Sequence, residues 1–293
     1  MKMYVKMLLV ILSCSLCFAG SLQPTAAPAP TMKPLSAIEP RMPVQGLSGS
    51  ATSMFVITEP GSYYMTGNIN ADPNKNGIEI ICSNVTVDLK GFTITGAGKS
   101  VGTIGTGIYA DDVNQITIQN GFISQFRGNG IDNQSGTNLT AENMVVENCF
   151  SSGIRGGSNC AVRNCKCCNN SSTGVSVGSG STVTDCTTNS NLNGISAWSD
   201  GCTISNNTVY NNSFGISACF QSYIHHNNIN NSTTGIMTYY DYNVIEYNIV
   251  TYCVVGLDLG ENQNLYLNNR LGGNVIDYQT ESGNTDGGGN IEF

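Results

Sequence analysis

The chain repeats a short phrase in which a glycine is followed by an aliphatic residue. The phrases are Gly77-Ile78, Gly107-Ile108, Gly130-Ile131, Gly153-Ile154, Gly174-Val175, Gly194-Ile195, Gly215-Ile216, Gly235-Ile236 and Gly256-Leu257. After a first interval of 30 residues they recur every 20 to 23 residues. A nearly fixed period of this size predicts a solenoid, in which each unit buries its apolar side chains against its neighbours.

Each unit contains three short apolar patterns and no helical one. After the glycine, apolar and polar residues alternate, as in Val175-Ser176-Val177, which predicts a strand with one buried face. A second apolar position follows nine to eleven residues after the glycine and a third about five residues later, for example Ile204 and Val209. The pattern therefore predicts an all-β coil with three short strands.

Asparagines recur between the predicted strands. One row is Asn120, Asn143, Asn207, Asn227 and Asn268, with Cys165 and Cys186 interposed, and another is Asn170, Asn191, Asn211 and Asn231. Asparagine tolerates left-handed backbone and bonds nearby peptide groups, so it suits a corner. Stacked one coil apart, these side chains are expected to bond each other as ladders. We expect the repeated glycine to occupy the tightest corner.

The segments outside the repeat have their own character. Residues 1–19 combine lysines, a short apolar core and small residues, which indicates a secretory signal peptide. Residues 20–50 hold six of the eight prolines and are expected to form a disordered spacer. Residues 51–76 are predicted to cap the first coil, 77–280 to form the solenoid, and 281–293 to be a glycine-rich tail.

Charge and hydropathy exclude some partners. The formal net charge is −8 and only 11% of the residues are charged, with no basic patch, so nucleic acid is not an expected partner. No later apolar run is long enough for a transmembrane segment. Together with the predicted signal peptide, these features predict an exported protein, either secreted or retained in the cell envelope.

Ten cysteines follow the predicted signal peptide, and an exported chain permits disulfides. Cys165 and Cys186 occupy equivalent positions on successive coils, which places their Cα atoms about 5 Å apart, within disulfide range. A stack of buried thiols is the alternative. The only two histidines, His225 and His226, fall on the second strand, where neighbours point to opposite faces, so no metal site is predicted there.

Two segments near the start of the repeat carry a family resemblance. Ile57-Thr58-Glu59-Pro60-Gly61-Ser62-Tyr63-Tyr64 and Asn84-Val85-Thr86-Val87-Asp88-Leu89-Lys90-Gly91-Phe92 resemble the first coils of secreted bacterial proteins of the pectate-lyase-like superfamily. The resemblance implies a right-handed single-stranded parallel β-helix, and the nine repeat phrases predict about nine coils. A leucine-rich repeat lacks support, since its leucine frame is absent, and a left-handed hexapeptide helix would need 18-residue coils.

The outward face of the first strand is the expected groove for an extended polymer. Tyr109, Asp111, Asp132 and Arg155 fall on three consecutive coils of this face. Asp111 and Asp132 are roughly 8 Å apart between Cα atoms, which suits an acid and a base flanking a glycosidic bond with inversion. Alternatively, Arg155 or Tyr109 abstracts a proton beside a uronic carboxylate while the two aspartates hold calcium. A plain surface ion pair between Asp132 and Arg155 is the simpler interpretation.

Two aromatic residues stand further along the same stripe. Trp198 and Tyr239 would offer flat surfaces to sugar rings, together with Tyr109. The catalytic motifs of the superfamily argue against an enzyme, because only Asp111-Asp112 matches the polygalacturonase set. We therefore expect a protein that binds polysaccharide or a cell-surface partner without a resident cofactor, and a polysaccharide lyase, epimerase or glycoside hydrolase is the alternative.

Overall fold

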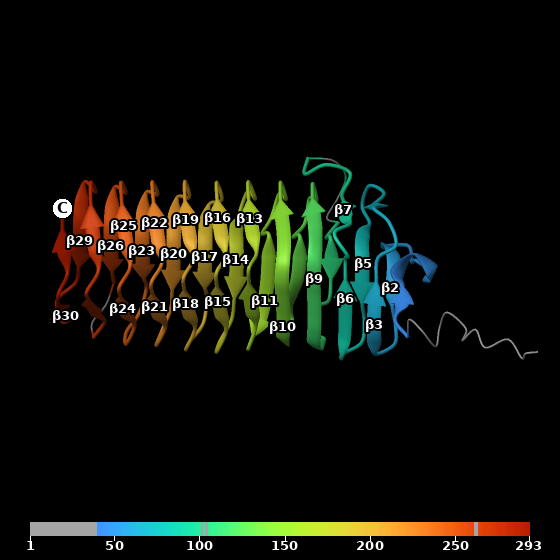
Figure 1. The fold of residues 1–293 in the computed structure, drawn as a ribbon, viewed down its shortest axis with the longest axis horizontal. Coiled ribbons are helices and arrows are strands. Elements are labelled where there is room, and N and C mark those ends of the chain that lie inside the picture. Colours follow the sequence, from blue (N-terminus) through green and yellow to red (C-terminus); the bar gives the residue numbers. More distant parts are fainter. Residues whose placement is uncertain (1–39, 101, 103–104, 261–262) are drawn as a thin grey trace, which may run out of the picture. The chain divides into compact units, whose positions relative to one another are not determined.

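The computed structural model describes residues 40–100, 102, 105–260 and 263–293. The unit from Arg41 to Phe293 is a stack of short strands, and no α-helix occurs among the described residues (Figure 1). The predicted signal peptide lies outside them, as does the predicted spacer through residue 39. Within the spacer range, β1 (Met42–Pro43) and a 3-10 turn (Val44–Gly46) pack on the first coil, with Val44 fully buried.

The strands form three parallel ladders, one for each side of the coil. The first comprises β2 (Ser53–Ile57), β5 (Asn76–Ile80), β8 (Ile108–Tyr109), β10 (Ile131–Glu147), β11 (Ile154–Ser158), β14 (Thr173–Val177), β17 (Asn193–Ala197), β20 (Phe214–Ala218), β23 (Thr234–Thr238), β26 (Val255–Leu259) and β29 (Ile276–Thr280). The second comprises β1, β3 (Gly61–Tyr64), β6 (Val85–Asp88), β9 (Asn114–Ser124), β10, β12 (Ala161–Arg163), β15 (Thr182–Thr184), β18 (Thr203–Ser205), β21 (Tyr223–His225), β24 (Val244–Glu246), β27 (Leu265–Leu267) and β30 (Thr285–Gly288). The third comprises β4 (Ile69–Asn70), β7 (Thr93–Thr95), β9, β10, β13 (Lys166–Cys168), β16 (Thr187–Asn189), β19 (Thr208–Tyr210), β22 (Asn228–Asn230), β25 (Ile249–Thr251), β28 (Arg270–Gly272) and β31 (Ile291–Glu292).

The structure confirms the all-β coil predicted from the repeat and the right-handed parallel β-helix implied by the family resemblance. The described stack has about twelve turns rather than nine. The difference arises because strands before Gly77 and after Gly256 also pair in register, although they lack the glycine phrase. A count of glycines therefore underestimates the number of turns.

The aliphatic residue of each phrase points into the core and stacks on its counterpart one turn away. Ile154 pairs with Val175, and Val175 pairs with Ile195, all of them fully buried. The glycine beside it lies at the start of a strand rather than at the tightest corner. A Cβ on Gly174 would lie 2.7 Å from the carbonyl oxygen of Gly194, so the close approach of successive turns requires glycine here.

The corners are formed by residues with left-handed backbone. At the corner between the second and third strands, φ lies between 52° and 60° at Asn120, Asn143, Asn164, Asp185, Asn206, His226, Tyr247 and Asn268. The residue after each points inward. The row predicted from the sequence therefore mixed corner residues that have left-handed backbone with the inward residues that follow them, since asparagine occurs at both positions.

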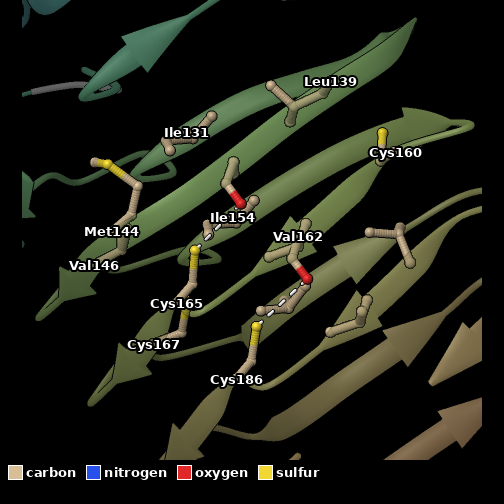
Figure 2. Close-up of a cluster of buried hydrophobic side chains, with 14 of the residues drawn as sticks. Ile131, Leu139, Met144, Val146, Ile154, Cys160, Val162, Cys165, Cys167 and Cys186 are labelled. Atoms are coloured by element: carbon tan, nitrogen blue, oxygen red, sulfur yellow. Dashed lines mark hydrogen bonds between the residues drawn. The ribbon is translucent and has the colours of Figure 1, made fainter. Parts of the chain in front are cut away.

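The inward corner residues form ladders along the stack. Asn227 accepts hydrogen bonds from the backbone N–H and the side-chain amide of Asn207, at 3.0 and 2.9 Å, and its own amide donates to Asn248 at 3.0 Å. These side chains satisfy buried peptide groups that the corner removes from the strand ladders. The same inward row continues towards the N-terminus as Cys186 and Cys165, which Figure 2 shows on neighbouring turns.

Candidate functional site

One row of outward side chains on the first ladder carries most of the charge of that face. Glu79 pairs with Tyr109, Tyr109 with Asp132, and Asp132 with Arg155, so the four residues lie on successive turns. Further along the same row come serines, beginning with Ser176. The strand register therefore brings predicted site residues that are 23 positions apart in the sequence into lateral contact.

A pocket of about 770 Å³ opens beside this charged row. It is lined by Thr52, Asn74, Asn76, Glu79, Thr106, Tyr109, Arg127, Gly128, Asn129, Asp132, Phe150, Ser151 and Arg155. The structure thus places Tyr109, Asp132 and Arg155 in one cavity, together with a second arginine and a second aromatic ring from the adjoining corner. We call these residues the charged pocket.

Asp132 is the most enclosed acidic group of the charged pocket. Burial raises the pKa of its carboxyl, whereas a hydrogen bond from Asn129 and the nearby charge of Arg155 oppose that rise. The side-chain amide of Asn129 donates to Oδ2 at 2.7 Å. The ion pairs found among the described residues do not join Asp132 to Arg155. Within that part of the chain, the guanidinium of Arg155 therefore faces the pocket without a carboxylate partner.

Asp111 lies beside the pocket but does not line it. Its carboxylate accepts hydrogen bonds from the Tyr109 hydroxyl at 3.3 Å and from the Ser135 backbone N–H at 3.0 Å. Hydrogen bonding from Ser135 lowers the pKa of Asp111, and burial together with Asp111 raises the pKa of Tyr109. The two aspartates therefore have environments that move their pKa values in opposite directions.

Trp198 and Tyr239 lie outside the charged pocket. Their side chains are exposed, at 42% and 49%. The Trp198 ring covers Gly178, since a Cβ on that glycine would lie 2.9 Å from Cζ2 of the indole. Arg155 pairs with Ser176 and Ser176 with Ser196, so Trp198 lies on the second turn beyond Arg155.

Several pocket residues were missed by the sequence interpretation. Arg127, Asn129 and Phe150 come from the corners that precede strands of the first ladder. The sequence interpretation considered only the outward positions of the strands, so it missed them. The guanidinium carbon of Arg127 lies 5.7 Å from the ring centre of Phe150. The available signal was the polar and aromatic content of the residues just before Gly130 and Gly153.

Cys165 and Cys186 are both buried free thiols in the structure. Cys165 Sγ donates to the carbonyl of Arg163 at 3.2 Å, and Cys186 Sγ donates to that of Thr184 at 3.3 Å. Each also contacts a carbonyl of the preceding turn, Ala141 for Cys165 and Val162 for Cys186 (Figure 2). The disulfide stays a prediction, which non-reducing peptide mapping tests.

The described residues contain neither a preformed metal cluster nor a membrane-spanning helix. Within these ranges, no group of three or more His, Cys, Asp or Glu side chains is arranged to hold a metal ion. No helix in the described part of the chain has the length and hydropathy needed to cross a membrane. Asp111 and Asp132 each have separate protein partners, so they do not form the many-oxygen shell that calcium takes.

Several solved structures share the fold. The A-module of the mannuronan C-5 epimerase AlgE6 of Azotobacter vinelandii aligns with a TM-score of 0.59 at 12% identity, covering 86% of this chain and 88% of that one. The Dettilon tailspike protein aligns with a TM-score of 0.67 at 16% identity, covering 82% and 58%. An exopolygalacturonase from Thermotoga maritima aligns at 0.53 and 10%, covering 82% and 80%. At these identities the likeness concerns the fold alone.

Sequence comparison identifies a family. No curated protein matches the chain significantly. The family model described as periplasmic copper-binding protein (NosD) matches residues 83–290, which includes most of the strands described above. Because the match extends over more than half of the chain, this protein belongs to the NosD family of periplasmic β-helix proteins.

Proposed function

We propose that this chain is an exported envelope protein that binds an acidic polysaccharide in the charged pocket. The main supporting observation is that Arg155 projects into a 770 Å³ cavity without a carboxylate partner among the described residues. A guanidinium group that has no carboxylate partner can offer two parallel N–H donors to the carboxylate of an acidic sugar.

The other pocket residues support the same ligand. Tyr109 and Phe150 offer apolar surfaces for sugar rings, and Arg127 supplies a second cation beside Phe150. Asp132 presents a carboxyl group that suits sugar hydroxyls, and the buried Asn129 orients it through their hydrogen bond. Together they supply cations for an acidic sugar, rings for its faces and polar groups for its hydroxyls.

A glycan-binding screen tests the proposal. The chain is measured against uronic-acid polymers and neutral polymers of matched length, and binding to the uronic set is expected to be tighter. Arg155→Ala is expected to weaken that binding about tenfold or more, as for loss of a charge-assisted hydrogen bond. Arg163→Ala is the matched control, because Arg163 pairs with Glu142 on the second ladder. Equal binding by wild type and Arg155→Ala would refute the proposal.

Catalysis on the bound glycan is the second candidate, and one observation favours it. In an acid and base pair, the surroundings of the two carboxyl groups move their pKa values apart. Here the pKa of Asp132 is raised while that of Asp111 is lowered. The expected sign of an enzyme is new reducing or unsaturated ends that disappear in Asp132→Asn. Binding without new ends in the wild type would contradict lyase or hydrolase activity.

Localisation follows from the same proposal. A periplasmic family and the apolar leader at residues 1–19 support export across the inner membrane. The mature chain is expected to begin at residue 20. Mass measurement of the protein recovered from the cell envelope tests this, and an intact Met1 on that protein would contradict it.

A further inference from the structure

A second pocket, of about 590 Å³, lies along the corner at which each turn passes from the third ladder to the first. It follows β16, β19, β22 and β25 over four successive turns, about 14 Å along the stack (Figure 1). The corner residues Ser190, Asn211, Asn231 and Tyr252 mark its course. It shares no lining residue with the charged pocket, so the two are separate, and we call it the corner pocket.

The lining of the corner pocket is polar but uncharged. It consists of asparagine, serine and threonine side chains, with one tyrosine and one valine. A lining without a cation or a carboxylate favours an uncharged ligand, and so much amide and hydroxyl surface favours a ligand rich in hydroxyl groups. A single aromatic ring adds a flat apolar surface on which the face of a sugar ring packs. The chemistry of the lining therefore fits an uncharged sugar.

Tyr252 occupies a corner position that suits asparagine. Its φ is 55°, and at the equivalent positions of the three preceding turns, where φ lies between 53° and 55°, the residue is serine or asparagine. Left-handed backbone is unfavourable for a bulky side chain, so the turn itself does not require a tyrosine here. The ring is 68% exposed and rests against Gly273, where a Cβ would lie 2.9 Å from its Cδ1 atom. A strained residue that presents an exposed, supported ring points to a binding role.

Ser232 interrupts a row of inward amides within the corner pocket. On the preceding turns the backbone N–H of Asn170 donates to Asn191 at 3.0 Å, and that of Asn191 donates to Asn212 at 2.9 Å. Ser232 takes the next place with a shorter side chain. It is 4% exposed, and its hydroxyl oxygen has no hydrogen-bond partner among the described residues. Because buried hydroxyl groups are normally paired, a ligand in the pocket would supply the partner that the described chain does not.

Two exposed amides lie beside Ser232. The side-chain amide of Asn231 donates to Oδ1 of Asn211, which leaves Nδ2 of Asn211 and Oδ1 of Asn231 without partners in the described part of the chain. These groups come from successive turns, which are about 4.8 Å apart. A sugar unit in an extended chain advances by a similar distance, so successive rings would meet successive turns.

We propose that the corner pocket binds an uncharged oligosaccharide of about three pyranose rings. Tyr252 stacks on one ring, and Ser232 forms a hydrogen bond with a hydroxyl group of the sugar. Asn211 and Asn231 donate to and accept from the hydroxyl groups of the neighbouring rings.

Isothermal titration calorimetry of the full chain with uncharged trisaccharides tests this inference. Cellotriose, maltotriose and triacetylchitotriose are the probes, and trigalacturonate is the charged comparison. At least one uncharged probe is expected to bind at one site per chain. Tyr252→Asn removes the ring and introduces a residue suited to the left-handed corner, as at Asn211 and Asn231. This variant is expected to bind the uncharged probe about tenfold more weakly.

Tyr247→Asn is the matched control. Tyr247 is an exposed tyrosine on the same turn with φ of 54°, but it does not line the corner pocket. This variant is expected to bind the uncharged probe as the wild type does. Failure of the wild type to bind every uncharged probe would overturn the inference, as would equal affinity in the wild type and Tyr252→Asn, or an equal loss in both tyrosine variants.

Ser232→Asn tests the base of the pocket. The longer side chain extends the inward row, so this variant is expected to keep or raise the melting temperature while it binds the uncharged probe about tenfold more weakly. Unchanged affinity would overturn the role of Ser232. Arg155→Ala is expected to leave binding of the uncharged probe unchanged, and Tyr252→Asn to leave binding of trigalacturonate unchanged, so the two proposals fail separately.

Discussion

Asp132 and Arg155 lie side by side on successive turns, yet Asp132 takes its hydrogen bond from Asn129. Strand register alone suggested a surface ion pair. The corner that carries Asn129 lies closer to the carboxylate, and its amide donates at 2.7 Å. A half-buried carboxyl group and a guanidinium without a carboxylate partner among the described residues therefore line one cavity.

The raised pKa of Asp132 predicts a pH-dependent stability. Between the ordinary pKa of 3.8 and the raised one, the folded chain binds more protons than the unfolded chain, so stability falls as pH rises through that window. Asp132→Asn removes this half-buried charge, so it is expected to raise the free energy of unfolding at pH 7 and to have no such effect at pH 3. Denaturant melts at both pH values measure it. Asp200→Asn, at an exposed position, is the control, and equal gains in both variants would contradict the prediction.

Asn227→Ala is expected to destabilise the stack by about 1–3 kcal/mol for each buried group left unpaired. Asn227 is 1% exposed, and its loss would leave the N–H of Asn207 without an acceptor. Urea unfolding gives the free energy. Asn228→Ala, one residue along and exposed, should change it by less than about 0.5 kcal/mol. Similar losses in both would show that the ladder contributes little.

Cys186→Asn is expected to fold and to retain or increase stability. Cys186 already occupies the place of a ladder asparagine, because its backbone N–H donates to Asn207 Oδ1 at 2.9 Å and its thiol donates to carbonyl groups. An amide forms stronger hydrogen bonds than a thiol in the same place. Thermal unfolding measures the change, with Cys186→Leu as the comparison that overfills the site. A melting temperature of Cys186→Asn below that of the wild type would contradict this expectation, whereas Cys186→Leu is expected to melt at a lower temperature than the wild type.

Trp198 is the only tryptophan, so its fluorescence reports how far a bound glycan extends. It lies on the second turn beyond Arg155, roughly 10 Å along the stack. A short acidic fragment that fills the charged pocket is expected to leave the emission unchanged, whereas a longer fragment shifts it. Trp198→Ala should weaken only the longer ligand. If both lengths bind equally well to that variant, the groove does not continue to Trp198.

The repeat phrase predicted the fold well because two physical demands coincide on it. The glycine permits the close approach of turns, and the aliphatic residue after it fills the core. The register of the first ladder can therefore be derived by aligning successive glycine phrases in the sequence. Corner positions were less predictable. Asn206 and Asn207 are neighbours with opposite roles, one with left-handed backbone and one inward, and composition does not separate them.

The candidate site was predictable only where it lies on strands. Tyr109, Asp132 and Arg155 follow from the outward positions of the first ladder. Arg127 and Phe150 depend on the path of the chain through a corner, which no periodicity describes. Strand alternation likewise placed His225 and His226 on opposite faces, but their Nδ1 atoms lie 2.9 Å apart because the corner at His226 has a positive φ angle.

The corner ladders make each turn a replaceable unit. Every turn in the later half receives one set of amide contacts from the turn before and passes an equivalent set to the next. Removing or duplicating about twenty residues there would join surfaces that already match. The number of turns can therefore differ between related chains, while the charged pocket, which earlier turns form, keeps its shape.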